Sequence, residues 1–212
     1  MNIQAELRCR CGEVRAVMRD PSPKTVNRVI CYCEDCQAFV HQLGRSDLLD
    51  SNGGTDIVQV APASLTFVQG QDKIAALRLS PKGLYRWYAR CCNTPVGNTL
   101  TPSLPFVGVV AQAFEADGQS PDALFGRPVG AILGKFAIGD VPAKAKGISF
   151  SLLLRVLRLT LGWRLAGKAW PHPFFERSSR DPLYPITVLS REQRDALRPL
   201  CGPRPQALTS VQ

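Results

Sequence analysis

The sequence predicts a mainly β protein with an α-helical C-terminal extension, in two parts that meet near residue 110. Residues 1–110 contain short segments in which apolar and polar residues alternate between turn residues, as expected of antiparallel strands. Seven of the eight cysteines lie in the same part, in three tight clusters that favour a metal-stabilised β domain. Residues 111–212 are basic and hold the longest segment of helical character, which we expect to pack on that domain.

The composition is that of an ordinary soluble globular chain, with 45% hydrophobic and 20% charged residues among 212. This length allows one domain with an appendage or two small domains. The N-terminus lacks the apolar stretch of a secretory signal, and no uncharged apolar run reaches the about 18 to 20 residues that span a bilayer. We therefore expect a cytoplasmic protein, where thiols stay reduced and clustered cysteines bind metal more often than they form disulfides.

Six segments of the first part are predicted as strands. They are residues 13–18, 25–32, 56–61, 64–70, 74–80 and 84–90. The separators between them carry the Gly, Asn, Asp and Pro residues that tight turns require. Residues 34–44 differ from this pattern, and we expect one or two helical turns there that end at Gly44.

The second part is predicted to be partly helical. Residues 101–119 are expected to begin extended and to run into a helix. Residues 120–126 fit a short helix capped by Ser120, and residues 190–202 fit another, capped by Ser190 with a glutamine in the reciprocal position.

The strongest helix signal lies in residues 147–170. On a helical wheel a narrow polar stripe is formed by Ser151, Arg155, Arg158 and Gly162. Leucines and a valine occupy most of the remaining surface: Leu152, Leu153, Val156, Leu157, Leu159 and Leu161. Such a helix is either mostly buried, against the sheet or another chain, or lies in a membrane surface. We expect burial.

The positive charge is concentrated towards the C-terminus. Residues 1–100 hold twelve Lys/Arg and nine Asp/Glu, a net charge of +3, whereas residues 127–180 hold ten and two, a net charge of +8. A basic face of this kind suits an acidic partner or anionic lipid, or is simply solvated. A nucleic-acid partner is not expected, because aromatic residues are not interleaved with the basic ones. Peripheral membrane contact and a homo-oligomer both stay open.

The cysteine clusters indicate metal binding. They read CRCG (Cys9, Cys11), CYCEDC (Cys31, Cys33, Cys36) and RCCNTP (Cys91, Cys92), whereas Cys201 stands apart and is not expected to be a ligand. Short turns within a cluster bring two sulfurs to one point, and a distant cluster completes the tetrahedral shell. Zn(II) is the expected ion, because it favours sulfur and has no redox chemistry.

Seven ligands divide into four plus three. We expect Cys31, Cys33 and Cys36 to hold one zinc with an open fourth position, as catalytic zinc sites do. The first and third clusters, Cys9 and Cys11 with Cys91 and Cys92, would then form a structural site.

This arrangement resembles the glutathione-dependent formaldehyde-activating enzyme family, which includes centromere protein V. The family pattern is C-x-C-G, then C-x-C-x-x-C, then an arginine–aromatic–C-x-x-C-G-[ST] motif. The matching residues over roughly residues 5–100 are Cys9, Cys11 and Gly12, then Cys31, Cys33 and Cys36, then Ser80, Gly83, Arg86, Tyr88, Cys92 and Thr94.

The resemblance implies an antiparallel β-tent (Mss4-like) fold pinned by two zinc ions, one structural and one in the active site. It also implies a carbon–sulfur lyase that joins formaldehyde to the thiol of glutathione. The chain departs from the pattern at Ala89, where the family has a cysteine, and at Asn93, where it has glycine. Cys91 either replaces the missing ligand or leaves a three-cysteine shell. The alternative function is a non-catalytic, zinc-stabilised interaction module with a basic C-terminal surface.

Several residues near the clusters have a possible role but a more ordinary interpretation. His41 suits a fourth ligand or proton relay, although a local hydrogen bond is the favoured reading. Glu34 and Asp35 are expected to cap the following turn rather than to orient a ligand. The turn at residues 51–56 offers amides for a carboxylate but is expected to be a plain turn, and His172 is expected to be structural.

Overall fold

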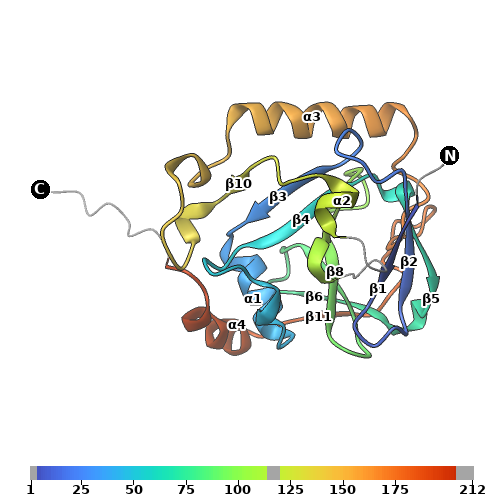
Figure 1. Ribbon diagram of the computed structural model, residues 1–212. Helices are drawn as coiled ribbons and strands as arrows, with labels where there is room; N and C mark the ends of the chain where they lie inside the picture. Colours follow the sequence, from blue (N-terminus) through green and yellow to red (C-terminus); the bar gives the residue numbers. More distant parts are fainter. Residues whose placement is uncertain (1–3, 114–119, 204–212) are drawn as a thin grey trace, which may run out of the picture.

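The computed structural model describes residues 4–113 and 120–203, which form two β-sheets and a few helices (Figure 1). The mainly β prediction is confirmed. The smaller sheet is antiparallel, with strand order β1-β2-β5. Its strands are β1 (Gln4–Arg8), β2 (Arg15–Arg19) and β5 (Leu65–Gln69).

The larger sheet has eight strands in the order β10-β3-β4-β9-β8-β7-β6-β11. In chain order these are β3 (Asn27–Cys31), β4 (Thr55–Val60), β6 (Ile74–Arg78), β7 (Tyr85–Ala89), β8 (Thr94–Thr99), β9 (Val107–Val110), β10 (Ala131–Ile132) and β11 (Ile186–Val188). In the spatial order of the sheet, all neighbouring strands between β3 and β6 are antiparallel. The edge strands differ, because β10 pairs in parallel with β3 and β11 pairs in parallel with β6. The strands of residues 1–110 pair antiparallel as predicted, but β10 and β11, from the part predicted to be helical, make the larger sheet mixed.

Both parallel edge strands come from residues 111–212. They reach the sheet through long connections, which is what parallel pairing requires. The C-terminal segment thus contributes strands to the same sheet as the cysteine-rich part. The division near residue 110 stays a prediction, as does the β-tent.

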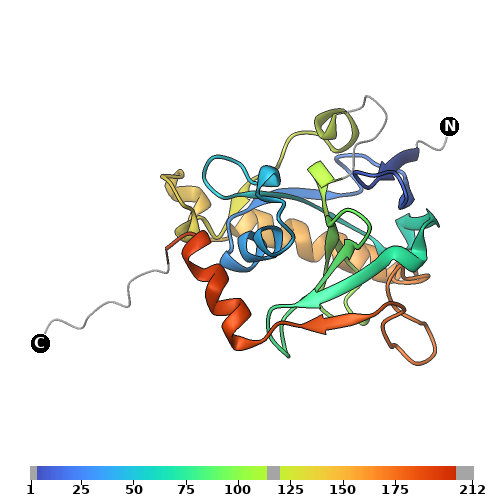
Figure 2. The ribbon, with the colours of Figure 1, turned by 90° about the horizontal axis from the view of Figure 1, so that it is seen from below.

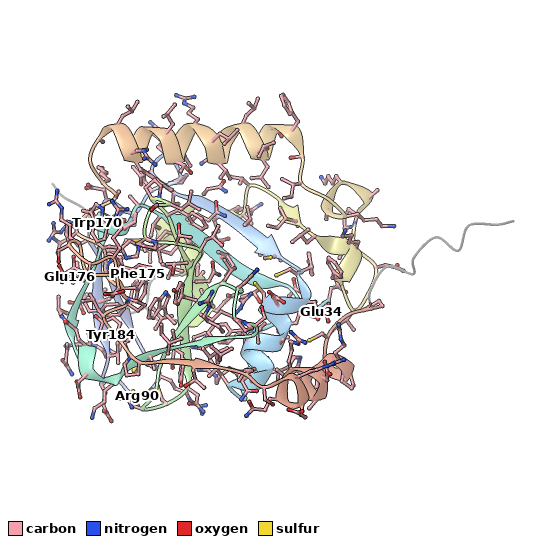
Figure 3. All side chains as sticks on the ribbon, turned by 180° about the vertical axis from the view of Figure 1, so that it is seen from behind. Glu34, Arg90, Trp170, Phe175, Glu176 and Tyr184 are labelled. Carbon is pink, nitrogen blue, oxygen red and sulfur yellow. The ribbon has the colours of Figure 1, made fainter. Side chains whose placement is uncertain are left out.

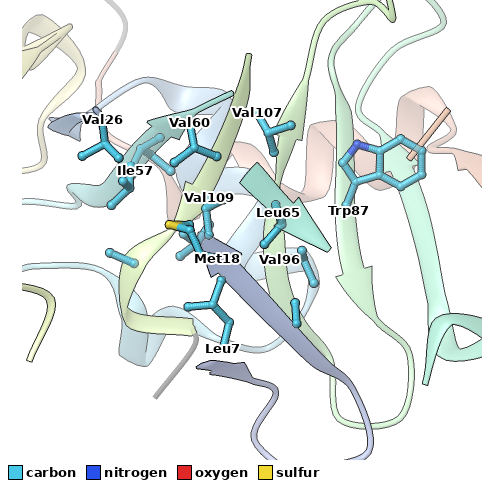
Figure 4. Packing of buried hydrophobic residues seen from close by; sticks show 14 of the residues in the cluster. Leu7, Met18, Val26, Ile57, Val60, Leu65, Trp87, Val96, Val107 and Val109 are labelled. Atoms are coloured by element: carbon cyan, nitrogen blue, oxygen red, sulfur yellow. The ribbon is translucent and has the colours of Figure 1, made fainter. Parts of the chain in front are cut away.

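The core lies where the inner faces of the two sheets meet (Figure 4). Leu7 and Met18 of the small sheet are buried there, as are Val96, Val107 and Val109 of the large sheet. Each of the six segments predicted as strands overlaps a strand of the structure, β2 to β7 in chain order. β8 was not predicted, because the Pro and Gly in TPVGNT are atypical of a strand.

Within the described residues, four α-helices and several single turns surround the sheets (Figure 2). The α-helices are α1 (Glu34–Gln42), α2 (Pro121–Phe125), α3 (Phe150–Leu165) and α4 (Arg191–Leu197). The short 3₁₀ turns are Ser46–Leu48, Pro62–Ser64, Gln71–Lys73, Ala111–Ala113, Gly134–Phe136, Ala143–Ala145 and Arg198–Leu200. Ser120 and Ser190 cap α2 and α4 as predicted, whereas the helix expected towards residue 119 falls partly in residues 114–119, outside the described residues.

α3 is not buried as expected against the sheet. Only Leu152 and Trp163 are buried, while Leu157 and Leu161 are 56% and 57% exposed. The side with Leu152 and Trp163 faces the protein, whereas the polar stripe lies on one flank of the helix, where Ser151, Arg158 and Gly162 are exposed. Arg155 of that stripe donates hydrogen bonds to the side chain of Asn27 and to the carbonyl oxygens of Pro23 and Val26. The helix runs along one edge of the molecule (Figure 1), and the leucines on its outer side are exposed.

An aromatic cluster fixes the loop after α3 to the core. The ring of Phe174 stacks on Trp87 with centroids 4.5 Å apart, and Phe175 meets Trp87 edge-on at 5.7 Å. His172 is 5% exposed, and its Nδ1 accepts a hydrogen bond of 3.1 Å from the amide of Phe174. The expectation that His172 is structural is confirmed. Tyr184 also meets the ring of Trp87 edge-on, at 6.1 Å, and Phe175 and Tyr184 are labelled in Figure 3.

Stability is expected to depend on pH through His172. Burial lowers the pKa of His172 from 6.5 to about 4, so the unfolded chain binds this proton first as the pH falls. The stabilisation is present above pH 6.5 and is lost between pH 6.5 and 4, with a loss of about 2 kcal/mol by pH 5. Denaturant unfolding at pH 7 and pH 5 measures it. In His172→Asn, whose side-chain oxygen still accepts the amide of Phe174, the same pH change should cost less. Equal pH dependence in both proteins would contradict the expectation.

Candidate metal centres

The first and third cysteine clusters form one four-sulfur cluster. The sulfur atoms of Cys9, Cys11, Cys91 and Cys92 all lie within 4.8 Å of one another. Cys9 Sγ is 3.6 Å from Cys11 Sγ and 3.8 Å from Cys91 Sγ, and the sulfurs of Cys91 and Cys92 are 3.9 Å apart. Cys91 thus belongs to this cluster, for which the sequence allowed either three or four cysteines.

Two tight turns bring these sulfurs together. Cys9 and Cys11 stand in the turn after β1, which Gly12 completes with φ +79°. Cys91 and Cys92 occupy the turn between β7 and β8, which Asn93 closes with φ +54°. Asparagine tolerates this left-handed conformation better than most residues, which explains how it stands where the resembled family has glycine. The bent backbone lets adjacent cysteines point to one place.

The second cysteine motif forms a three-sulfur cluster. Cys31 ends β3, Cys33 caps the N-terminus of α1, and Cys36 lies in the first turn of that helix. The sulfurs are all within 4.8 Å of one another, and those of Cys31 and Cys36 are 3.9 Å apart. Cys31 and Cys36 are buried, whereas Cys33 is partly exposed. The strand-to-helix turn therefore groups three thiols from six consecutive residues.

The spacing of both clusters fits a zinc ion. A tetrahedral zinc with Zn–S distances of about 2.3 Å separates its sulfur ligands by about 3.8 Å. The four sulfur–sulfur distances given above are 3.6–3.9 Å, and none of these cysteines is in a disulfide. Each cluster could therefore hold a metal ion, one with four protein thiolates and the other with three.

A buried arginine accompanies the three-sulfur cluster. Arg86 of β7 is 0% exposed, and its Nη1 lies 3.8 Å from Cys36 Sγ. Its Nη2 pairs with Asp35 at 3.3 Å, and its guanidinium lies over the ring of Phe39 at 5.6 Å. Asp35 thus binds an arginine beside the site. The sequence showed Arg86 only as part of a motif, because 50 residues separate it from Cys36.

Local electrostatics favour one thiolate in each cluster. Hydrogen bonds from Cys31 and Cys33, together with the charge of Arg86, hold the pKa of Cys36 well below its usual value. Burial raises the pKa of Cys92, but hydrogen bonds from the Thr94 hydroxyl and from Cys11 outweigh it and lower the value to about 6. The Thr94 oxygen lies 3.0 Å from Cys92 Sγ. Thiolates are the form that binds metal.

A small cavity lies beside the first turn of α1, with a volume of about 250 Å³. Its wall includes Ser80 and the side chains of Arg194 and Arg198 from the C-terminal segment. Arg198 forms an ion pair with Glu34, which lies close to α4 in Figure 3. Residues after 190 therefore bring two cations next to the helix that carries Cys33 and Cys36.

Other predicted residues are not part of either cluster. Among the described residues, the group of mutually close donor atoms at the three-sulfur cluster contains no histidine, so His41 is not brought to it. The amides of Asn52 and Gly54 both donate to Asp50 Oδ1 at 2.8 Å, which confirms a plain turn. Cys201 lies apart, with its sulfur 3.4 Å from the carbonyl oxygen of Leu197.

The fold and these clusters define a mainly β protein with two sites suited to metal binding by thiolates. The chain belongs to a family of unknown function, DUF6151, which matches residues 1–183. No curated protein matches the sequence. A crystal structure of a Rhodobacter sphaeroides protein is similar at 16% sequence identity and a TM-score of 0.41, covering 61% of this chain and 100% of the other.

Proposed function

We propose that this protein binds two zinc ions, a structural ion at the four-sulfur cluster and an active-site ion at the three-sulfur cluster. The observation that carries the proposal is the pair of clusters with sulfur separations of 3.6–3.9 Å but different ligand numbers. Four thiolates saturate a tetrahedral ion, whereas three leave a coordination position for an outside ligand. Cytoplasmic thiols, which stay reduced, would keep both sites available.

The proposed activity is that of a carbon–sulfur lyase acting on a small thiol such as glutathione and an aldehyde adduct. In the synthetic direction, the thiol sulfur bonds to the carbonyl carbon, and the thiol proton passes to the carbonyl oxygen, which becomes a hydroxyl. A zinc ion in a three-thiolate site supplies Lewis acidity for a bound thiol or carbonyl. Support comes from the residues shared with the glutathione-dependent formaldehyde-activating family, Arg86 among them.

Residues of this chain supply the surroundings such a reaction needs. With a divalent ion bound, the three thiolates would carry a net charge of −1, which Arg86 would offset, and Arg86 is itself held by Asp35. Arg194 and Arg198 line the cavity beside α1 together with Glu34 and Asp35, so its wall offers partners for both the carboxylates and the amino group of a glutathione-like thiol.

The second candidate is a non-catalytic, zinc-stabilised interaction module. The departures at Ala89, Cys91 and Asn93 favour it, because the turn that carries them keeps its four-sulfur geometry without the family motif. The outward apolar side of α3 favours it as well. This candidate keeps both metal ions but predicts no effect on thiol–aldehyde equilibration.

Metal stoichiometry tests the division into two centres. Wild-type protein is expected to contain two zinc ions per chain, and Cys33→Ser one, with unchanged far-UV circular dichroism. The fold should survive because the three sulfurs come from one short segment and tie no distant elements together. Cys201→Ser is the matched control and should retain two ions, since this thiol lies outside both clusters.

Two outcomes separate the candidate functions. If zinc-loaded protein speeds the formation or cleavage of the glutathione–formaldehyde adduct and Cys33→Ser does not, the lyase proposal is supported. If the wild type holds two ions but neither binds glutathione nor alters the equilibration rate, the interaction module stands instead. A single ion in wild type that Cys33→Ser retains would overturn the two-centre proposal itself.

A further inference from the structure

We infer that the outer face of α3 is a docking surface for an anionic phospholipid bilayer. This face consists of Phe150, Leu153, Leu154, Leu157, Leu161 and Leu165, and Ile148 precedes it. Their exposed fractions run from 45% for Leu153 to 80% for Leu165. Single exposed leucines are common on proteins, but a contiguous row along one helix marks a contact surface.

The position of α3 suits contact with a flat surface. The helix runs along one side of the molecule, and side chains project from it away from the sheets (Figures 1 and 3). At 16 residues it is about 24 Å long. Among the described residues, no helix is long and apolar enough to cross a membrane, so contact through α3 means lying in the surface.

Charge selects an anionic surface as the occupant. The exposed Arg158 borders the apolar row on one side, the exposed Arg164 lies in line with the row at its C-terminal end, and Lys144, Lys146 and Lys168 flank the two ends of the helix. Residues 127–180 together carry a net charge of +8. Two copies of the chain meeting through α3 would bring two such segments together, which electrostatic repulsion opposes. Anionic lipid offers an apolar layer beneath a negative one, matching both features.

A basic cavity beside α3 strengthens this inference. It has a volume of about 950 Å³ and lies between the helix and the region where β2 ends and β3 begins. Its lining includes one anionic residue, Asp20, and five cationic ones: Arg19, Lys24, Arg155, Arg158 and Lys168. None of the five cationic residues forms an ion pair with a carboxylate in residues 4–113 or 120–203. Leu154 belongs to the apolar row and Arg158 borders it, and both residues also line the cavity. A lipid could therefore place its phosphate in the cavity while its acyl chains contact the leucines.

Vesicle co-sedimentation tests the docking surface with the full chain. Binding is expected to vesicles of equal parts phosphatidylcholine and phosphatidylglycerol, much weaker binding to phosphatidylcholine alone, and a steep decline with salt. The double variant Leu157→Gln/Leu161→Gln should weaken binding by at least about tenfold. The double variant Arg158→Gln/Arg164→Gln should weaken it by about 30-fold on the anionic vesicles. Because these side chains are exposed, circular dichroism should be unchanged in both.

The vesicle experiment has a control variant and specific outcomes that would contradict the inference. Val68→Thr removes an apolar side chain that is 60% exposed on β5, away from α3, and should bind vesicles like wild type. Absence of vesicle binding, or binding that both double variants retain, would overturn the inference. A wild-type dimer in sedimentation equilibrium that Leu157→Gln/Leu161→Gln dissociates, without vesicle binding, would assign the face to a second copy instead. Glycerol phosphate that fails to compete would place the essential contact on the bilayer rather than on free phosphate.

Discussion

Replacing Cys92 with serine is expected to remove one metal ion per chain and to unfold the protein. The four-sulfur cluster joins the turn after β1 to the turn between β7 and β8, and 82 residues separate Cys9 from Cys91. One ion there would fasten the small sheet to the large one. A structural thiolate site contributes on the order of 10 kcal/mol of apparent folding energy, which is comparable to the total stability of a domain.

Elemental analysis and thermal unfolding followed by circular dichroism would measure this effect. Cys92→Ser should contain one metal ion fewer than wild type. It should already be unfolded at room temperature and therefore show no cooperative transition on heating. The matched comparison is Cys33→Ser, which also loses one ion but keeps the transition, since its cluster lies within one strand-to-helix turn. Wild-type metal content and an unchanged melting temperature in Cys92→Ser would contradict a structural role for the four-sulfur cluster.

The strands could be predicted where local pattern and tertiary structure agree. β2 to β7 all overlap segments predicted from alternation, and β2 and β5 do alternate in burial, whereas β3, β4 and β6 are buried at nearly every residue. β10 and β11 have two and three residues and exist through pairing with strands far away in the chain. No local pattern marks a strand of that length, so the mixed character of the sheet could not be predicted.

The orientation of α3 shows where hydrophobic patterning fails. The pattern placed the leucines inwards, on the general rule that an apolar face seeks the core. The helix does bury one apolar side, with Leu152 and Trp163, and Arg155 fixes its flank through hydrogen bonds to two carbonyl oxygens and to the side chain of Asn27, where β3 begins. Apolar residues occupy most of the circumference of this helix, so burying one side leaves the leucines of the other side exposed. A sequence pattern shows how apolar a helix is, but not how many of its sides have a neighbour.

The cysteine sites were predictable from spacing, whereas their surroundings were not. Three thiols within six residues are expected to lie close together, and the sulfurs of Cys31, Cys33 and Cys36 do so. The grouping of Cys91 with Cys92 depended on the left-handed conformation of Asn93, which a sequence permits but does not specify. Arg86 reaches the site only through the pairing of β7 in the sheet.

Substituting Arg86 with methionine is expected to weaken metal binding at the three-sulfur cluster by about 10- to 100-fold. The guanidinium is fully buried, 3.8 Å from Cys36 Sγ. Three thiolates around a divalent ion carry a net charge of −1, and burial makes that charge costly unless a cation balances it. Without Arg86 the pKa of Cys36 should rise, because Arg86 is one of the groups that lower it. Protons would then compete more strongly with the metal, and binding should shift to higher pH.

Competition with a chelator across pH 6 to 9 would measure both the affinity and the shift. Arg86→Lys keeps a cation and should restore most of the affinity, although it loses the two-pronged contact with Cys36 and Asp35. The four-sulfur cluster serves as the internal reference, since its ion should be retained in both variants if the sheets remain intact. A purely structural role for Arg86 would lower stability in both variants without moving the pH profile. An unchanged affinity and pH profile in Arg86→Met would show that the thiolates need no charge from this arginine.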